Sequence, residues 1–173
     1  GFAYVPEDRQ HEGLALSLGV RENVTIASLA EYVRGPFLSG ASERAATERL
    51  GRRLGIKAAG WDAPVGELSG GNQQKVVIAK WLATRPKVVI LDEPTKGIDV
   101  GSKAAVHDFI GELAEDGLAV ILVTSELPEA MGLADRLIVL HEGRIAGRFV
   151  RGEWSAEAIV AAATGGAARS DAA

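Results

Sequence analysis

The sequence contains no cysteine among its 173 residues. This absence excludes disulfide bonds and thiolate metal sites, and it suits a reducing cytoplasm. Histidine is scarce as well, and its three positions do not have the spacing of metal ligands. We therefore expect surface or packing roles for His11, His107 and His141.

Long hydrophobic runs are also missing. No apolar stretch approaches the roughly 20 residues that a membrane-spanning helix needs, and the chain opens without a recognisable signal peptide. The net charge of −4 at pH 7 argues against a nucleic-acid-binding surface. With 47% apolar and 24% charged residues, the sequence is expected to form one globular domain or part of one.

A third absence concerns phosphate binding. Many nucleotide-binding proteins cradle phosphates in a loop of the form Gly-x-x-x-x-Gly-Lys-Ser/Thr. None of the six lysines in this sequence follows a glycine, so that loop is absent from it. Any role in nucleotide chemistry must therefore depend on other residues or on a phosphate loop elsewhere.

Residues 68–93 hold the most informative pattern. Residues 68–75 read Leu-Ser-Gly-Gly-Asn-Gln-Gln-Lys, a Gly-Gly turn that opens a helix. Glycines allow another molecule to approach the backbone closely, and the free N–H groups of a helix start attract anions. Residues 88–93 read Val-Val-Ile-Leu-Asp-Glu. This run is typical of a buried parallel strand that delivers carboxylates to the carboxyl edge of a sheet.

The alternation of strand and helix patterns predicts an α/β sandwich with a parallel sheet core. Strands are expected at 2–6, 87–92, 118–124, 137–140 and 144–149. Helices are expected at 19–33, 42–54, 72–84, 102–116 and 155–163, with a short one opening at 125–129.

The helix at 42–54 shows how its faces are expected to divide. Ser42 is expected to cap its start and Gly55 to end it. The inward face is predicted to hold Ala45, Leu50 and Leu54. The outward face is predicted to hold Glu43, Arg44, Glu48, Arg49, Arg52 and Arg53. Trp61, in the loop that follows, either covers the core or contacts a partner, and the first use is the more common.

The two patterns in residues 68–93, in this order, resemble the signature motif and the Walker B strand of an ABC-type ATPase. The Asn-Gln-Gln-Lys extension is similar to the carbohydrate-importer branch, and in particular to the second half of its tandem ribose-, galactose- and xylose-type ATPase subunits. The resemblance implies an α/β, P-loop NTPase-like fold. Its mainly parallel sheet core would be flanked by helices and joined by a helical subdomain.

The same resemblance implies how the chain is organised. Residues 1–163 would form part of a nucleotide-binding domain, with the helical subdomain at about 19–67. Residues 68–150 would carry the signature, Walker B, D-loop and switch regions, and 164–173 a disordered tail. The family carries its phosphate loop upstream of the matched region. The chain is therefore expected to be the C-terminal portion of a longer polypeptide.

The resemblance assigns catalytic roles to three acidic residues. Asp92 takes the place of the Walker B aspartate, which holds Mg²⁺, commonly through water, and Glu93 would polarise the attacking water. Glu7 takes the place of a glutamine that touches the magnesium ion and that water. For Asp92 and Glu93 the alternative is two strand-end acids paired with nearby Lys or Arg, and for Glu7 it is a solvated turn acid.

ATP-binding roles are implied for five further positions. Ser69, Gly70 and Gly71 would bind the γ-phosphate of a nucleotide that the opposite domain holds, so they would work across a dimer interface. Asn72 stands where many ABC ATPases have glutamine, and asparagine is usual in the carbohydrate branch. Asp99 matches the D-loop, which aligns the two sites. The implied cofactors are ATP and Mg²⁺.

Ser125 is the clearest departure from the family pattern. The family usually places a histidine there, which contacts the γ-phosphate, and serine cannot carry its positive charge. The implied pair of sites is asymmetric. The site built on Glu7, Asp92, Glu93 and Ser125 would hydrolyse poorly, and the site completed by this chain's signature motif would do most of the turnover.

The function implied is that of a fragment of the ATP-hydrolysing subunit that energises import of a sugar or similar polar solute. Its partners would be a second nucleotide-binding domain, membrane-spanning permease subunits and, indirectly, a periplasmic solute-binding protein, with no nucleic acid. It would lie peripherally on the cytoplasmic face of the plasma membrane. Without a phosphate loop, the fragment alone is expected to be inactive.

Two other functions remain open. One is an ABC ATPase outside transport, which the helical segment 19–67 and Ser125 oppose. The other is a degenerate nucleotide-binding regulatory or scaffold domain. Ser125 and Glu7 favour it, and the intact Asp92 and Glu93 oppose it.

Overall fold

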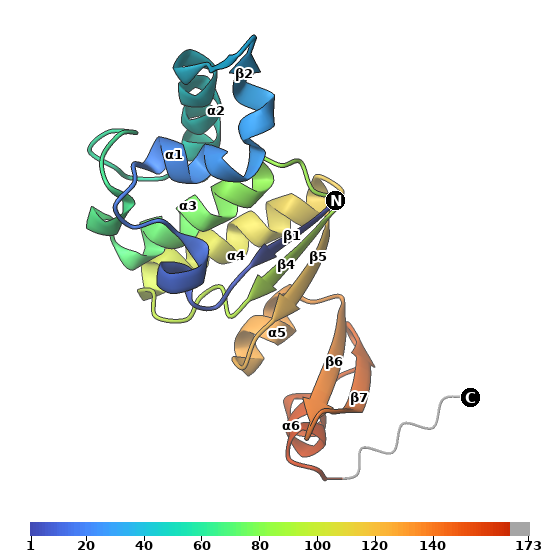
Figure 1. Ribbon diagram of the computed structural model, residues 1–173. Coiled ribbons are helices and arrows are strands. Elements are labelled where there is room, and N and C mark those ends of the chain that lie inside the picture. Colours follow the sequence, from blue (N-terminus) through green and yellow to red (C-terminus); the bar gives the residue numbers. More distant parts are fainter. Residues whose placement is uncertain (167–173) are drawn as a thin grey trace. The chain divides into compact units, whose positions relative to one another are not determined.

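The computed structural model describes residues 1–166, which divide into a first unit of residues 1–123 and a second that begins at Thr124 (Figure 1). Most of the predicted tail at 164–173 lies outside the described residues. Thr164 itself ends the last helix, and its backbone N–H donates to Val160 O. No described helix combines the length and the apolar character needed to cross a membrane.

A three-stranded parallel sheet forms the centre of the first unit. It consists of β1 (Phe2–Val5), β4 (Val88–Asp92) and β5 (Ala119–Val123), in the order β1-β4-β5. Register pairs Val5 with Leu91 and Asp92 with Val123. The apolar runs therefore form the parallel core that the sequence predicts, and Asp92 ends the central strand at its carboxyl edge.

Two helices, α3 (Gly70–Leu82) and α4 (Val100–Glu115), cover one face of this sheet (Figure 1). Both begin two residues earlier than predicted, because Ser69 and Asp99 are their N-cap residues. Gly117 ends α4 as expected and has φ +86°, a conformation that favours glycine. The buried faces hold Val76, Val77, Ile78 and Ala79 of α3 and Val106, Phe109, Ile110 and Leu113 of α4.

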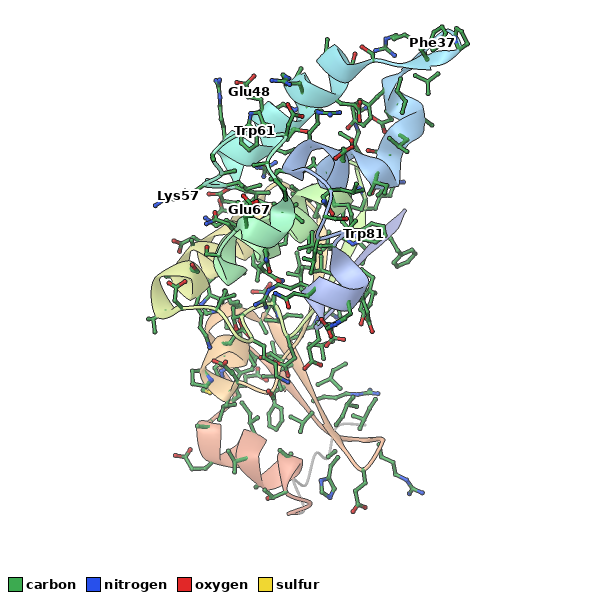
Figure 2. The ribbon with its side chains drawn as sticks, turned by 60° about the vertical axis from the view of Figure 1, so that its left-hand side comes forward. Phe37, Glu48, Lys57, Trp61, Glu67 and Trp81 are labelled. Atoms are coloured by element: carbon green, nitrogen blue, oxygen red, sulfur yellow. The ribbon has the colours of Figure 1, made fainter. Side chains whose placement is uncertain are left out.

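The other segments of the first unit are short apart from α2. They are the π-helical turn η1 (Arg9–Gly13), α1 (Val20–Thr25), the 3₁₀ segment η2 (Ile26–Tyr32), the hairpin β2 (Val33–Arg34) and β3 (Phe37–Leu38), α2 (Gly40–Arg53) and the 3₁₀ turn η3 (Val65–Glu67). The single helix predicted at 19–33 is thus an α-helix followed by 3₁₀ turns. Phe37 lies at the tip of the hairpin (Figure 2).

The prediction for α2 was wrong at its start and on one face. Ser39, not Ser42, is the N-cap residue, and its hydroxyl accepts the Ser42 N–H at 3.3 Å. Ala45 is exposed and Ala46 is buried in its place. Glu43, expected outside, is only 5% exposed. Its burial is possible because Thr25 and Arg21 donate to its carboxylate, at 2.8 and 3.2 Å.

Trp61 packs against α2 at Gly51, one of the buried residues of that helix. A side chain at Gly51 would place its first carbon 2.4 Å from the indole ring, so the ring lies directly on the glycine. This contact supports the packing role for Trp61, which lies beside α2 on the segment that leads to α3 (Figure 2).

The second unit contains α5 (Leu127–Leu133), the antiparallel pair β6 (Arg136–His141) and β7 (Arg144–Val150), and α6 (Ala156–Ala163). Both strands extend the predicted ranges by one or two residues. Its core consists of Leu137, Val139, Ile159 and Ala162. Ser155 caps α6 by accepting the Ala158 N–H at 3.2 Å.

Candidate nucleotide site

Asp92 lies at the carboxyl end of β4 and has a partner that the sequence did not indicate. The Tyr4 hydroxyl donates to Asp92 Oδ2 at 2.8 Å, and this hydrogen bond raises the pKa of Tyr4. Tyr4 pairs with Ile90 in the parallel register, and Ile90 and Asp92 lie on the same side of β4. A tyrosine in the neighbouring strand was the available signal, but only the register shows which carboxylate it meets.

Glu93 follows Asp92 in a strained backbone conformation. Its φ is +45°, which is uncommon for a residue other than glycine. Its N–H donates to Val123 O at 2.9 Å, and its carbonyl accepts the Lys96 N–H at 3.0 Å. The chain therefore leaves the strand at Glu93 and turns sharply. Strain of this kind recurs at functional sites, so the conformation is compatible with the predicted role of Glu93.

Glu7 already has a cationic partner. Its carboxylate forms a close ion pair with Lys96, and this interaction raises the pKa of Lys96. Both side chains are about half exposed, at 48% for Glu7 and 63% for Lys96. The sequence suggested either a metal ligand or a solvated acid at this position. The ion pair with Lys96 is a third arrangement, and the role implied for Glu7 remains a prediction.

The residues at the strand end fit magnesium only as a partial ligand set. Within residues 1–166 no group of three or more histidine, aspartate or glutamate side chains could hold a metal ion. Mg²⁺ commonly takes one or two carboxylates and fills its remaining positions with water and nucleotide phosphates. A single carboxylate such as Asp92, half-buried at a strand end, is compatible with that arrangement.

The start of α3 is formed by Ser69, Gly70 and Gly71, which we call the signature turn. As N-cap residue, Ser69 has extended backbone angles, and its side chain does not cap the helix. Asn72 Nδ2 donates to Ser69 Oγ at 2.9 Å, and Asn72 Oδ1 accepts the Lys57 N–H at 2.8 Å. The Ser69 hydroxyl proton is therefore left for another acceptor. The first N–H groups of a helix have no acceptor within it, so they are donors of the kind that bind anions.

Gly70 and Gly71 are tightly packed by other parts of this chain. A Cβ atom at Gly70 would lie 2.8 Å from Arg9 Nη2 and 3.4 Å from Gly97 O. A Cβ atom at Gly71 would lie 2.3 Å from Ser102 Oγ. The sequence analysis explained the two glycines by the approach of another molecule. The structure adds a requirement from within the chain, because a side chain at Gly71 would clash with Ser102 and one at Gly70 would force the Arg9 guanidinium to move.

Asp99 is the N-cap residue of α4. Its two carboxylate oxygens accept the Ser102 N–H at 2.9 Å and the Ser102 hydroxyl at 2.7 Å, which lowers the pKa of Asp99. Because Ser102 also touches Gly71, Asp99 and the signature turn are linked through one serine. Arg9 of η1, Lys96 of the turn after β4 and Ser102 of α4 therefore contact predicted site residues, and the sequence analysis missed them.

Ser125 belongs to the second unit, between β5 and α5. The neighbouring Glu126 N–H donates to Thr124 Oγ1 at 3.0 Å, which fixes the backbone just before α5. The role implied for Ser125 remains a prediction.

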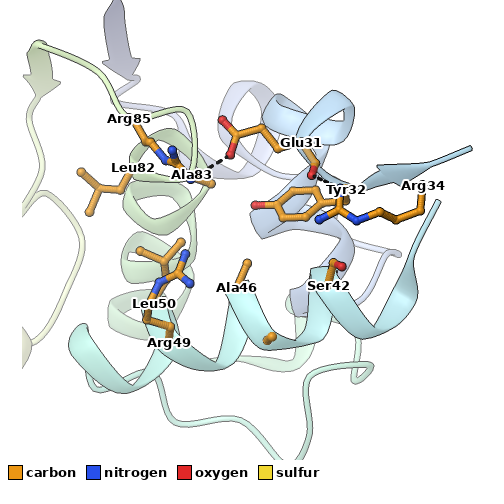
Figure 3. Close-up of a pocket in the computed structure, with 11 residues that line it drawn as sticks. Glu31, Tyr32, Arg34, Ser42, Ala46, Arg49, Leu50, Leu82, Ala83 and Arg85 are labelled. Carbon is orange, nitrogen blue, oxygen red and sulfur yellow. Dashed lines mark hydrogen bonds and ion pairs between the residues drawn. The ribbon is translucent and has the colours of Figure 1, made fainter.

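A pocket of about 310 Å³ lies away from all these residues, between η2, α2 and the end of α3 (Figure 3). Three arginines, Arg34, Arg49 and Arg85, line it together with Glu31. Glu31 pairs with Arg85 at 3.4 Å, which leaves an excess of positive charge in the pocket. None of the predicted site residues lines it.

Comparison with known proteins places this geometry in a family. The family model described as ABC transporter matches residues 2–96. Ribose import ATP-binding protein RbsA 1 of Agrobacterium fabrum is 57% identical over 167 residues, covering 96% of this chain and 33% of that protein. Ribose import ATP-binding protein RbsA of Chromobacterium violaceum is 50% identical over 171 residues, covering 99% and 34%. The chain thus spans about a third of the length of these curated relatives.

Solved structures agree with the sequence comparison. The dimeric post-hydrolysis state of the ATP-binding cassette MJ0796, bound to ADP and Pi, matches with a TM-score of 0.74 and 26% identity, covering 88% of this chain and 64% of that one. CbiO1 from Clostridium perfringens, part of the ABC transporter complex cbiONQ, matches with a TM-score of 0.69 and 26% identity, covering 85% and 56%.

Proposed function

The chain belongs to the ABC transporter family, and from this membership we propose that it is part of an ATP-binding subunit that energises import of a sugar or similar small polar solute. Ribose import is the activity named for its relatives. The observation that carries the proposal is the signature turn at Ser69, with its available hydroxyl proton and helix-start N–H groups, beside a sheet that ends in Asp92 and Glu93.

The signature turn would complete an ATP site on a second nucleotide-binding domain. The Ser69 hydroxyl and the first N–H groups of α3 would donate to the γ-phosphate, and this stabilises negative charge without a formal positive charge. Asn72 would hold the Ser69 hydroxyl in the required direction through its 2.9 Å hydrogen bond. Asp99 would fix α4 against this turn through Ser102.

The strand end would serve the chain's own ATP site. A bound Mg²⁺ would neutralise charge on the phosphates. Asp92 would contribute one carboxylate to it, with Tyr4 holding that carboxylate in place. Glu93 would accept a proton from the attacking water. Because Glu7 pairs with Lys96 and serine stands at position 125, we expect this site to hydrolyse ATP slowly and the site completed by Ser69 to do most of the turnover.

The surface of residues 19–67 would contact the membrane-spanning permease subunits on the cytoplasmic side. Large apolar side chains are unusually exposed there, led by Phe37 at 74%. The others are Ile26, Leu29, Val33 and Leu38. Exposed apolar side chains gathered in one short segment are typical of an interaction surface. The arginine-lined pocket between η2 and α2 adjoins this segment and would take an acidic part of the partner.

The decisive experiment uses the complete polypeptide that the gene encodes, assembled with its permease. ATP turnover is measured for Ser69→Tyr and Glu93→Gln, with Glu112→Gln on the exposed part of α4 as control. We expect Ser69→Tyr to remove most of the turnover and Glu93→Gln to remove a smaller part. If Ser69→Tyr left turnover unchanged while Glu93→Gln abolished it, the chain's own site would be the more active of the two ATP sites, which is the reverse of the proposal.

The same measurement tests the second candidate, a nucleotide-binding regulatory or scaffold domain. Ser125 and Glu7, which pairs with Lys96, favour it, because both would weaken the chain's own site. A regulatory domain would show no loss of turnover in either variant, whereas an ATPase loses turnover in at least one of them.

A further inference from the structure

Arg9 lies where three separate loops of the first unit meet. It begins η1, and the Asp8 carboxylate fixes this turn by accepting the N–H groups of Gln10 at 3.2 Å and His11 at 3.1 Å. The turn directs the Arg9 guanidinium toward the loop that follows Glu93. There Nη1 donates to Lys96 O at 3.0 Å and Nη2 donates to Gly97 O at 3.2 Å.

The same guanidinium also lies on the signature turn. A Cβ atom at Gly70 would be 2.8 Å from Nη2, so glycine is what allows the guanidinium to lie there. Gly97 has φ +69°, a conformation that favours glycine and turns its carbonyl to Arg9. Arg9 Nε is buried and has no hydrogen-bond partner among residues 1–166. A buried donor left unpaired is costly, so the position is held by the contacts of the other two nitrogens.

We propose that Arg9 is a positioning residue that holds the loop after Glu93 against the signature turn, so that the two ATP-site segments of this chain keep one geometry. This inference rests on the proposed function. Glu93 belongs to the held loop because its carbonyl accepts the Lys96 N–H at 3.0 Å. Ser69 belongs to the other side because it immediately precedes Gly70.

Arginine suits this role for a physical reason. Its planar guanidinium presents donors in a fixed fork, so it reaches two neighbouring carbonyls without further ordering, whereas a lysine ammonium is a single point of charge. Hydrogen bonds from a charged donor are also stronger than neutral ones. Two nearby contacts support the same junction. Gln10 Nε2 donates to Gln73 Oε1 at 3.2 Å, and Glu7 pairs with Lys96.

The test measures kcat and KM for ATP in the complete polypeptide with its permease. Arg9→Ala should lower kcat about tenfold to a hundredfold, since small misplacements of catalytic groups have effects of that size. KM should change by less than about twofold, because the nucleotide is anchored elsewhere. Arg9→Lys should give an intermediate loss. Arg148→Ala, which removes an exposed arginine of β7, outside the segments proposed to bind nucleotide or permease, is the matched control and should leave kcat unchanged.

A second variant makes the test geometric. Gly70→Ala inserts a methyl group where the guanidinium lies, so it should displace Arg9 and speed amide hydrogen exchange of residues 95–98 as Arg9→Ala does. The double variant should then exchange no faster than the faster single variant, because both changes remove the same contact. Exchange in the double variant well above that of either single variant would overturn the proposal.

Amide hydrogen exchange of residues 95–98 provides a readout that does not depend on ATP turnover. Exchange should be faster in Arg9→Ala than in Arg148→Ala, and unchanged exchange would overturn the proposal whether or not the protein is an ATPase. If turnover is present but Arg9→Ala leaves kcat unaffected, the positioning role fails while the proposed function stands. If no turnover is found at all, the proposed function fails and the exchange rates alone decide on Arg9.

Discussion

The two faces of the β1-β4-β5 sheet are built from the same strands but meet different surroundings. On the face covered by α3 and α4, Ala3, Val5, Val89 and Leu91 are at most 1% exposed. On the opposite face, the side chains of β1 and β5 remain open, with Phe2 76% exposed and Ile121 49% exposed. Parallel sheets are normally buried on both faces. The exposed apolar side chains on this face therefore indicate a surface suited to contact with further protein, beyond the contacts made within residues 1–166.

The open face also holds the carboxylate that we propose for magnesium. Tyr4 and Asp92 meet on it, so the carboxylate that we propose for magnesium lies on the side of the sheet that is free to meet further protein or nucleotide. The covered face, by contrast, holds the buried packing residues Ala3, Val5, Val89 and Leu91. The comparison therefore separates a stabilising face from a face on which a site can be completed, and substitutions can test that separation.

The largest effect is expected from lysine at Val89, compared with lysine at Ile121. Val89 is 1% exposed, and placing an unpaired charge there should lower the free energy of unfolding of the 173-residue chain by at least about 4 kcal/mol. Ile121→Lys adds the same side chain on the open face and should change the free energy of unfolding by less than about 0.5 kcal/mol. Urea unfolding followed by circular dichroism measures both. Equal effects would contradict the distinction between the faces.

Substitutions at buried and exposed positions of α2 should also differ in their effect on the free energy of unfolding, by a smaller amount. Glu43 is buried, and Glu43→Ala leaves Arg21 and the Thr25 hydroxyl without that partner. Its cost should be about 2 kcal/mol, below the full value for a buried ion pair because Arg21 also binds Asp62. Glu48→Ala, which removes a pair with Arg52 on the exposed side, should cost at most about 0.5 kcal/mol. A larger loss of stability in Glu48→Ala than in Glu43→Ala would contradict this interpretation.

These positions also show how much could be predicted from the sequence. The inward residues of α4 and the strand that ends in Asp92 follow from local patterns, since helical periodicity and apolar runs are properties of adjacent residues. The burial of Glu43 could not be predicted from the α2 pattern, because its partners come from α1. Arg9 and Tyr4 were missed for the same reason. Arg9 binds Lys96 O, 87 residues away along the chain, and Tyr4 binds Asp92, 88 residues away, and a distant pairing has no local pattern.

A third prediction concerns the open face in the complete polypeptide. The chain spans about a third of its relatives, and we expect additional protein to cover Phe2 and Ile121 when the whole polypeptide is present. Ile121→Lys should then cost about 2 kcal/mol or more in the complete polypeptide, although it is nearly neutral in the 173-residue chain. Thermal unfolding of both forms measures the difference. A neutral effect in both would mean that this face stays exposed to solvent.

The smallest expected effect concerns the hydrogen bond on the open face. The hydrogen bond that the Tyr4 hydroxyl donates to the Asp92 carboxylate raises the pKa of Tyr4. The folded state therefore holds the Tyr4 proton more firmly than the unfolded state does. The resulting stabilisation is complete below the ordinary tyrosine pKa of about 10 and is lost as the pH rises through the higher pKa of the folded state. Asp92→Asn should bring the Tyr4 pKa back toward its ordinary value. Phenolate absorbance during a pH titration measures the shift, and Tyr4→Phe identifies the signal, since the chain has only two tyrosines. If Asp92→Asn does not lower the Tyr4 pKa, the two side chains are not hydrogen-bonded in solution. Tyr4 would then not hold the carboxylate proposed for magnesium.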